Sequence, residues 1–449
     1  MQTASKKVIN GWAMYDWANS VYSLVITSSI FPAYYEAVTS GKKIVFLGRT
    51  FNEPSALYAY AVAFSFLTVA IISPLLSSIA DAFGNKKRFM QFFCYMGSLS
   101  CCAMYWFQPD NPQLGIVLFI SASIGFGASI VFYNAYLPEI AAEKDQDHVS
   151  AKGFALGYIG SVILLLICLV IVTKPALFGI ADTTKASQIS FLLTGIWWMA
   201  FAQITFAVLP KGEANPVSKS HNAFTKGYAE LRKVWNELKH QTTLKRFLLA
   251  FFFLGMGVET VMYSAALFAK QQIFPNTGNK ETDAANGGKL ILTILIIQIV
   301  AIGGSYLFSF SSKKIGNLKV LLIGVLIWAG ICAWAYFVYT EIAFYCLAAT
   351  VGLVMGGIQS LSRSTYSKFM PPTKDTASYF SFYDVCDKVS TVIGMATFGM
   401  VTEGLGGMRN AVLFLMSYFI ISFFILLYTL IKQPKDLTTF QKLSNLKTI

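Results

Sequence analysis

The stretch Trp12-Ala13-Met14-Tyr15-Asp16-Trp17-Ala18-Asn19-Ser20 leads directly into an apolar run that ends at Pro32. A carboxylate within hydrocarbon costs about 2.5–3.5 kcal/mol, so an acid in a membrane span usually faces a cavity or a charged partner. On a helix, the polar side chains of this segment fall on one continuous stripe, made up of Asp16, Asn19, Ser20, Ser23 and Thr27. The sequence therefore predicts a first membrane span with one face lining a polar space.

The composition is that of a membrane protein. Of the 449 residues, 55% are hydrophobic and only 13% are charged, which is too apolar for a soluble domain of this size. The net charge of +13 does not call for nucleic acid as a partner, because basic cytoplasmic loops give membrane proteins the same excess. The seven cysteines lie in apolar stretches without metal-ligand spacing. We expect them to be buried, with neither a disulfide framework nor a metal site.

A helix needs about 20 apolar residues to cross a bilayer. By that measure the chain has twelve candidate spans, at 12–36, 55–80, 88–107, 114–137, 152–173, 188–209, 246–270, 289–310, 319–339, 342–364, 378–402 and 410–431. An even number of spans places both termini on one side of the membrane. That side would hold 25 of the 35 lysines and arginines, so we expect both termini in the cytoplasm.

The spans fall into two groups of six. We expect an N-terminal half at 1–209, a cytoplasmic linker at 210–245 and a C-terminal half at 246–449. Two six-span halves joined in this way are typical of secondary transporters, which bind substrate between the halves near the middle of the membrane. Apolar side chains at helical spacing in the linker also predict an amphipathic helix on the cytoplasmic surface, formed by Phe224, Tyr228, Leu231, Trp235 and Leu238.

Two loops at matching positions of the halves share a turn sequence. The first reads Asp81-Ala82-Phe83-Gly84-Asn85-Lys86-Lys87, and the second reads Lys313-Lys314-Ile315-Gly316-Asn317. Gly84 allows a tight turn, and Asp81 is placed to bind a helix N-terminus or a basic side chain. The first loop resembles the loop signature of the major facilitator superfamily and departs from it at Ser77, Ala82 and Asn85. That resemblance implies a conformational gate that includes Asp81, Gly84, Lys86 and Lys87.

Two further strings lie around spans 4 and 5. Span 4 ends with Tyr133-Asn134-Ala135-Tyr136-Leu137-Pro138-Glu139, and span 5 contains Gly153-Phe154-Ala155-Leu156-Gly157-Tyr158. Together with the opening stretch, they resemble the Atg-type vacuole effluxer family of the major facilitator superfamily, in its bacterial branch. The resemblance covers essentially the whole chain. It implies an all-α fold of twelve transmembrane helices in two pseudo-repeated six-helix halves, and export of amino acids or related metabolites.

The same resemblance places Tyr133 and Asn134 among the candidate substrate-binding residues. Because Pro138 ends the helix of span 4, Glu139 would lie at the cytoplasmic rim, and we assign it to the gate.

The middle of span 7 carries Glu259, followed by Thr260 and by Tyr263 one turn later. The resembled family usually has an amide at the position of Glu259. Two interpretations of this acid stay open: a proton-sensitive group, or a protonated carboxyl that replaces the amide as a hydrogen-bonding side chain.

Spans 10 and 11 carry the remaining charges. Gln359 and Arg363 belong to a polar stripe of span 10, and Arg363 either extends toward the cytoplasmic interface or binds a substrate carboxylate. In span 11, Asp384 and Lys388 have the i,i+4 spacing of an ion pair. That pair either locks the span to its neighbours or takes part in coupling and substrate binding.

These patterns lead us to expect a secondary active transporter for a small polar solute, with no enzymatic activity and no cofactor. Spans 1 and 7 are equivalent in the two halves, so their polar residues are expected to face each other across a cavity that span 11 completes: Asp16, Asn19 and Ser20 opposite Glu259, Thr260 and Tyr263, with Asp384 and Lys388. We expect protons as the coupling ion, a monomer, and a bacterial-type plasma membrane. A non-transporting receptor or scaffold, and a membrane-embedded lipid-modifying enzyme, remain as alternatives.

Overall fold

The structure is a computed structural model that describes residues 2–52, 54–210, 223–275, 280–404 and 407–432, without the side chains of 223–227, 280, 281 and 283–285. Most of the described chain is helical, because in hydrocarbon an apolar segment can satisfy its backbone hydrogen bonds internally only as a helix or a closed barrel. The predicted linker residues 211–222 and the end of the chain at 433–449 lie outside the described residues.

The elements follow one another in two series of helices. The first series is α1 (Lys6–Val21), η1 (Tyr22–Ile30), α2 (Phe31–Thr39), strands β1 (Ile44–Phe46) and β2 (Arg49–Phe51), α3 (Pro54–Phe83), α4 (Lys86–Ala103), η2 (Met104–Trp106), α5 (Pro112–Ala135), α6 (Leu137–Ile140), α7 (Gln146–Thr173), η3 (Pro175–Phe178) and α8 (Thr183–Val208). After α9 (Ala223–His240), the second series is α10 (Thr242–Gln272), α11 (Lys280–Ile315), α12 (Asn317–Tyr336), α13 (Glu341–Phe369), α14 (Thr376–Gly404) and α15 (Met408–Lys432).

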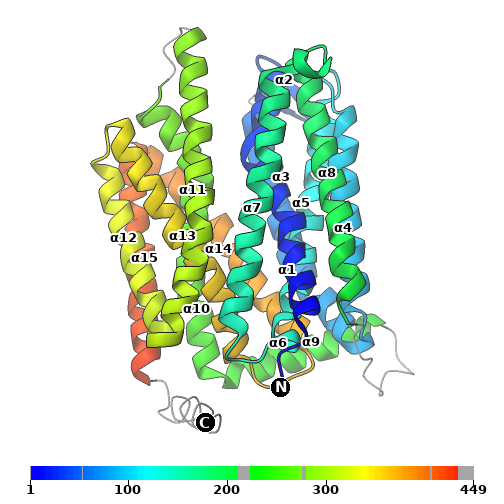
Figure 1. The fold of residues 1–449 in the computed structure, drawn as a ribbon, viewed down its shortest axis with the longest axis vertical. Helices are drawn as coiled ribbons and strands as arrows, with labels where there is room; N and C mark the ends of the chain where they lie inside the picture. The colour runs from blue at the N-terminus through cyan, green and yellow to red at the C-terminus, as the bar shows by residue number, and fades with distance from the viewer. Residues whose placement is uncertain (1, 53, 211–222, 276–279, 405–406, 433–449) are drawn as a thin grey trace.

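The two series form two bundles that stand side by side (Figure 1). Helix α1 begins and α15 ends at the same end of the molecule, which we call the terminal end (Figure 1). Between the bundles, α3 packs against α14, and α7 packs against α11 and α13. These contacts bring the polar faces of the two series together along one seam.

Nine helices of the described chain are long and apolar enough to cross a membrane. They are α3, α5 with α6, α7, α8, α10, α11 from Asn286, α12, α13 and α15. Helices also occupy the other three predicted spans. The first of these spans is divided into three elements, α4 carries three charged residues, and α14 carries four. The count of twelve spans therefore stays a prediction, while the two-bundle helical fold is confirmed.

The first span is not one uniform α-helix. Between α1 and α2, residues Tyr22–Ile30 form a π-helix, a conformation often found at functional sites. Pro32 lacks an amide hydrogen, and its ring would collide with the carbonyl of Ser28 in a regular α-helix. The wider π segment accommodates the proline, and the hydroxyl of Ser28 donates a hydrogen bond to the carbonyl of Ser23 at 2.9 Å.

A short hairpin and one exposed cysteine were not expected from the sequence. Strands β1 and β2 pair antiparallel, and Leu47 and Gly48 between them both have positive φ, as a two-residue hairpin turn requires. All seven cysteines are free, but Cys346 is exposed. Four of the others are buried, and Cys102 and Cys386 are half-buried. The expectation that all seven are buried is therefore wrong at Cys346 and only partly met at Cys102 and Cys386.

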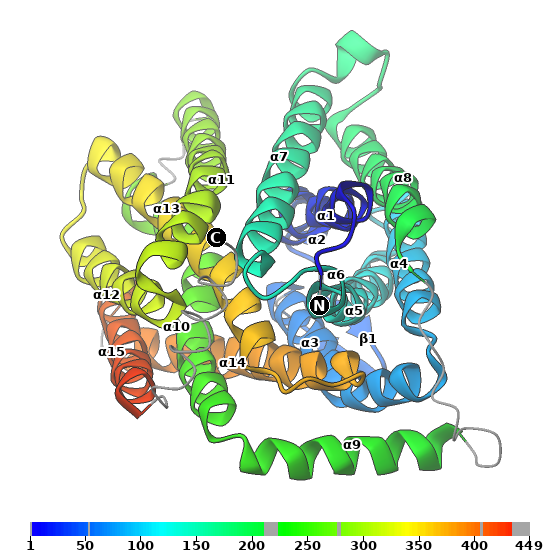
Figure 2. The same ribbon diagram turned by 60° about the horizontal axis from the view of Figure 1, so that its bottom comes forward.

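Helix α9 crosses the terminal end of the molecule (Figure 2) and packs against α3, α10 and α14. Leu238 of the predicted apolar face is buried, as is Val234, which was not assigned to that face. Tyr228 and Trp235, which were assigned to it, are 64% and 50% exposed. The ring of Trp235 lies 5.7 Å from that of Phe382 on α14. The side chain of Phe224 lies outside those that the structure describes.

Candidate functional site

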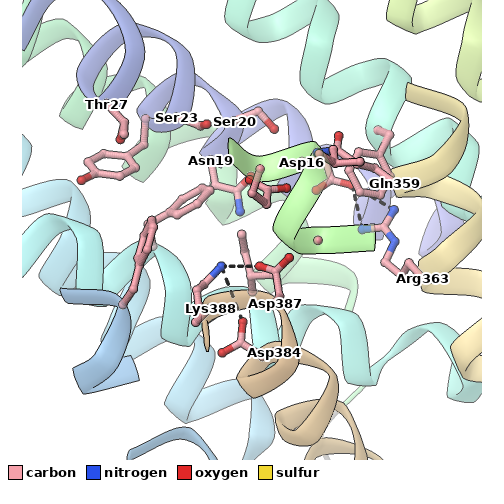
Figure 3. A pocket seen from close by; sticks show the side chains of 18 of the residues that line it. Asp16, Asn19, Ser20, Ser23, Thr27, Gln359, Arg363, Asp384, Asp387 and Lys388 are labelled. Carbon is pink, nitrogen blue, oxygen red and sulfur yellow. Dashed lines mark hydrogen bonds and ion pairs between the residues drawn. The ribbon is translucent and has the colours of Figure 1, made fainter. Parts of the chain in front are cut away.

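A cavity of about 250 Å³ lies between the two bundles. Most of the residues predicted for the substrate site line it: Asp16, Asn19, Ser20, Asn134, Glu259, Tyr263, Gln359, Arg363, Asp384 and Lys388. Ser23 and Thr27 line it as well, so the polar stripe of the first span faces a cavity as predicted, in spite of the π segment. Figure 3 shows this stripe opposite the charged residues of α14.

A buried ion pair joins the two bundles at one end of the cavity. Both terminal nitrogens of Arg363, on α13, donate to the Oδ2 atom of Asp16, on α1, at 3.3 Å. Arg363 is 3% exposed and Asp16 7%. The Nε atom of Arg363 also donates to the hydroxyl of Ser150 on α7 at 2.9 Å. The interpretation of Arg363 as a side chain that extends to the interface is therefore wrong, because the opposite bundle holds it in the interior.

Aromatic rings enclose the same guanidinium. Its central carbon lies 4.2 Å from the ring centroid of Phe154, 4.9 Å from that of Trp12 and 5.4 Å from that of Tyr133. These contacts add cation–π attraction to the ion pair. Gly153 leaves the room that the pair needs, since a Cβ atom there would lie 2.4 Å from Oδ2 of Asp16.

Two residues predicted for the substrate site do not line the cavity. The hydroxyl of Tyr133 donates to Asp16 at 2.7 Å, so this fully buried tyrosine lies behind the acid and supports it. Thr260 is also fully buried and faces Gly394 of α14. Glu259 and Tyr263 are one turn apart on the cavity face of α10, and Thr260 points about 100° away from Glu259. The prediction that Thr260 faces Asp16 across the cavity is therefore wrong.

The charged residues of α14 form a compact cluster (Figure 3). The ammonium of Lys388 lies 2.8 Å from Asp387 and 3.9 Å from Asp384. The hydroxyl of Ser73, on α3 of the other bundle, donates to Asp384 at 3.4 Å. The i,i+4 spacing predicted a role for Asp384 but not for Asp387, although three charged residues within 384–388 indicate both acids.

Three of the predicted gate residues lie in a network at the terminal end. Asp81, at the end of α3, accepts hydrogen bonds from the backbone amide and the hydroxyl of Ser378, at 2.7 and 2.8 Å. Ser378 lies in the first turn of α14, so the acid caps a helix N-terminus of the opposite bundle. Lys86 forms an ion pair with Glu139 and donates to Thr376 at 2.8 Å.

The turn itself is built as the sequence predicts. Gly84 has a φ of 63°, and Gly316 in the matching loop has a φ of 90°, values that favour glycine. The ammonium of Lys87 donates to the carbonyl of Leu209 at 2.9 Å.

A second inter-bundle network escaped the sequence analysis. Asp147, at the beginning of α7, is 3% exposed and accepts hydrogen bonds from three side chains of the other bundle. They are Ser312 at 2.8 Å, Asn317 at 2.8 Å and Lys368 at 2.7 Å. Asn317 belongs to the second of the two matching loops. In the first loop sequence the acid is Asp81. Here the loop supplies a donor, Asn317, and the acid, Asp147, lies at the start of α7.

Comparison with known families identifies the chain. The family described as "Vacuole effluxer Atg22 like" matches residues 4–436. The chain belongs to this Atg22-like family. A relative in Bacillus subtilis (strain 168), the MFS-type transporter YxiO, is 31% identical over 96% of this chain and 95% of its own length. Autophagy-related protein 22 of Kluyveromyces lactis is 25% identical over 93% of this chain and 92% of its own.

Solved structures place the Atg22-like chain in the major facilitator fold. The proton:xylose symporter XylE matches with a TM-score of 0.69 at 13% identity, over 94% of this chain and 95% of the other. The Escherichia coli fucose:proton symporter FucP matches with a TM-score of 0.66 at 14% identity, over 94% and 97%. This fold, together with the 31% identity to the MFS-type transporter YxiO, shows that the chain is a multi-pass membrane protein of the major facilitator transporter type.

Proposed function

We propose that this chain is a secondary active transporter that exports an amino acid or related small metabolite by alternating access. One observation carries the proposal: a polar cavity between the two bundles is bounded at one end by the ion pair of Asp16 and Arg363, which joins the bundles. A buried pair whose partners sit on different bundles is an arrangement that relative motion of the bundles would break and remake. The family name supports export as the direction.

In this proposal the terminal end faces the cytoplasm and is closed in the present state. The networks around Asp81 and Asp147 lie beyond the ion pair, and both join the bundles. At the opposite end, Lys270 lies 4.0 Å from Glu36, and both side chains are exposed. Opening toward the cytoplasm would therefore break buried charge contacts. Among the described residues, the ion pair that opening on the other side would break is the exposed one of Lys270 and Glu36, which has small energetic value.

The moving units in this proposal are 1–209 and 246–449, with 210–245 as the linker between them. We assign the molecule to a bacterial-type plasma membrane, as a monomer with both termini in the cytoplasm. No catalytic role or cofactor is part of the proposal. Asp81, Gly84, Lys86, Lys87 and Glu139 act as the cytoplasmic gate.

Protons are the proposed coupling ion, with Glu259 and Asp16 as the groups that exchange them. Both acids line the cavity, where carboxylates are costly unless they are paired or protonated. We assign the pair of Asp384 and Lys388 to coupling as well, because Ser73 of the other bundle contacts Asp384 and motion between the bundles would alter this contact.

The test is solute-driven pH change in proteoliposomes that contain the purified full-length protein. We expect a pH signal for at least one class of small solute in the wild type, and its loss in Glu259→Gln and in Asp16→Asn. Glu403→Gln is a matched control, because Glu403 is exposed at the end of α14 and its charge is outside the cavity. If solute moves without any pH signal, coupling to protons is wrong while transport stands.

A further inference from the structure

The cavity contains more acidic than basic side chains. Its lining includes the carboxylates of Asp16, Glu259, Asp384 and Asp387, but only two cations, Arg363 and Lys388. Arg363 pairs with Asp16, and Lys388 is shared by Asp384 and Asp387. When all these groups are ionised, the described lining has a surplus of two negative charges. A buried charge without a partner is costly, so a ligand of positive charge would be favoured here.

Glu259 is the acid that is left without a cation. It lines the cavity from α10, and no ion pair joins it to any lysine, arginine or histidine that the structure describes. Its electrostatic neighbours are Asp387 and Lys388 on α14 and Gln359 on α13. Lys388 already has two closer acids, so its charge does not balance Glu259.

The same region already accommodates one ammonium group. Lys388 places its ammonium beside two carboxylates and 5.4 Å from the ring centroid of Phe66. The ring of Tyr263, one turn from Glu259 on α10, lies 6.0 Å from that of Phe66 and lines the cavity too. Carboxylates together with aromatic rings are the surroundings that organic ammonium groups prefer. Glu259 and Tyr263 offer these surroundings to a second ammonium.

A hydrogen-bond donor without a partner lines the same cavity. Asn19 is 1% exposed, and its Nδ2 atom has no hydrogen-bond partner. A buried donor without an acceptor costs free energy, and Asn19 belongs to the stripe of α1 that lines the cavity opposite α14 (Figure 3). A ligand that fills the cavity can supply the acceptor as a hydroxyl, carbonyl or carboxylate oxygen.

We propose that the preferred cargo is a small organic cation, with an ammonium group bound by Glu259 and an oxygen acceptor bound by Asn19. This inference rests on the proposed transport function and adds the charge of the solute to it. The cavity volume of about 250 Å³ is below the roughly 300–1,000 Å³ of sites for drug-sized ligands, which restricts the cargo to small molecules. The geometry favours a solute of net charge +1 over neutral or anionic solutes of the same length.

The test is binding of three amino acids with the same number of carbon atoms to the purified full-length protein, measured by calorimetry. L-lysine has a side-chain ammonium, L-norleucine ends in a methyl group, and L-2-aminoadipate ends in a carboxylate. We expect L-lysine to bind at least tenfold more tightly than L-norleucine, and L-2-aminoadipate to bind most weakly. Glu259→Gln should reduce the ratio of the L-lysine to L-norleucine affinities to about one, while Glu403→Gln should preserve it.

Three outcomes would overturn the inference. One is an L-norleucine affinity equal to or above that of L-lysine in the wild type. Another is an unchanged ratio in Glu259→Gln, provided that this variant retains a cooperative melting transition. The third is no binding of any of the three solutes by protein that melts cooperatively. Proteoliposomes that transport L-norleucine without any preference for charge would uphold the proposed transport function and refute only the cationic cargo.

Discussion

Arg363 on α13 and Asp16 on α1 form an ion pair between residues that are 347 positions apart in the chain. Both side chains are buried, and the contacts of Arg363 with Ser150, Asn134 and three aromatic rings leave little of its hydrogen-bonding capacity unused. The pair bounds one end of the cavity, and in the proposed mechanism the terminal end beyond it is closed. Its integrity therefore affects both the stability of this state and the path of the solute.

Removal of one partner should be more harmful than removal of both. Asp16→Asn leaves the buried guanidinium without its counter-charge, and breaking a buried pair in this way costs about 3–5 kcal/mol. The double variant Asp16→Asn with Arg363→Met should melt at a higher temperature than Asp16→Asn alone, although neither should transport. Differential scanning fluorimetry of the detergent-solubilised proteins provides the comparison. Equal melting temperatures for the single and double variants would contradict an energetic coupling between the two residues.

A substitution of Gly153 should disturb the same pair without removing either charge. In Gly153→Ala the new Cβ atom would overlap Oδ2 of Asp16 and come within 3.0 Å of Arg363. We expect transport in proteoliposomes to fall at least tenfold, because the pair and α7 must separate to make room. Gly303→Ala is the matched control, since no atom lies within 4 Å of the Cβ position there. Full activity of Gly153→Ala would show that the pair tolerates displacement.

A reversible cross-link should lock the terminal end. The hydroxyls of Ser78 on α3 and Ser378 on α14 lie 3.2 Å apart, so cysteines at both positions would be close enough to form a disulfide. Oxidation of the double variant Ser78→Cys with Ser378→Cys should abolish transport, and a reductant should restore it. Each single cysteine variant should stay active in oxidant. Transport that continues through a fully formed cross-link would show that this end does not need to open.

Loss of Asp147 should weaken the contacts between the two bundles at the terminal end. Asp147→Asn removes the negative charge that accepts from Lys368, Asn317 and Ser312. The ammonium of Lys368, whose side chain is 11% exposed, then loses its counter-charge. In the proposed mechanism, the equilibrium between conformations should then shift toward the one that is open at the terminal end. The Ser78–Ser378 disulfide would then form more slowly, which non-reducing electrophoresis can follow over time. An unchanged rate of cross-linking would mean that the two networks act independently.

Several features of this protein follow from local sequence alone. The length of the apolar runs predicts the long helices, since a bilayer requires about 20 apolar residues for each crossing. The 3.6-residue period placed Asp16, Asn19 and Ser20 on one face, and they line one cavity. Gly84 and Gly316 predicted two tight turns, because only glycine adopts a positive φ without strain. Each of these properties depends on residues that are neighbours along the chain.

Other features depend on how distant segments pack. The sequence placed Arg363 in a polar stripe but left its partner open, and the contact with Asp16 exists only because α7 and α13 pack at the seam. Thr260 follows Glu259 directly, yet it faces Gly394 because α14 packs on that side of α10. The acceptor role of Asp147 likewise requires α11, α12 and α13 to meet the start of α7.

The sequence by itself thus determined a bundle of membrane helices with polar faces, and the tertiary structure decided which charges neutralise one another. Helical period and span length are local, because they arise from backbone geometry and the thickness of the bilayer. The pairing of Asp16 with Arg363, and the absence of any such partner for Glu259 among the described residues, arise from the packing of two bundles. No spacing within a single helix encodes that packing.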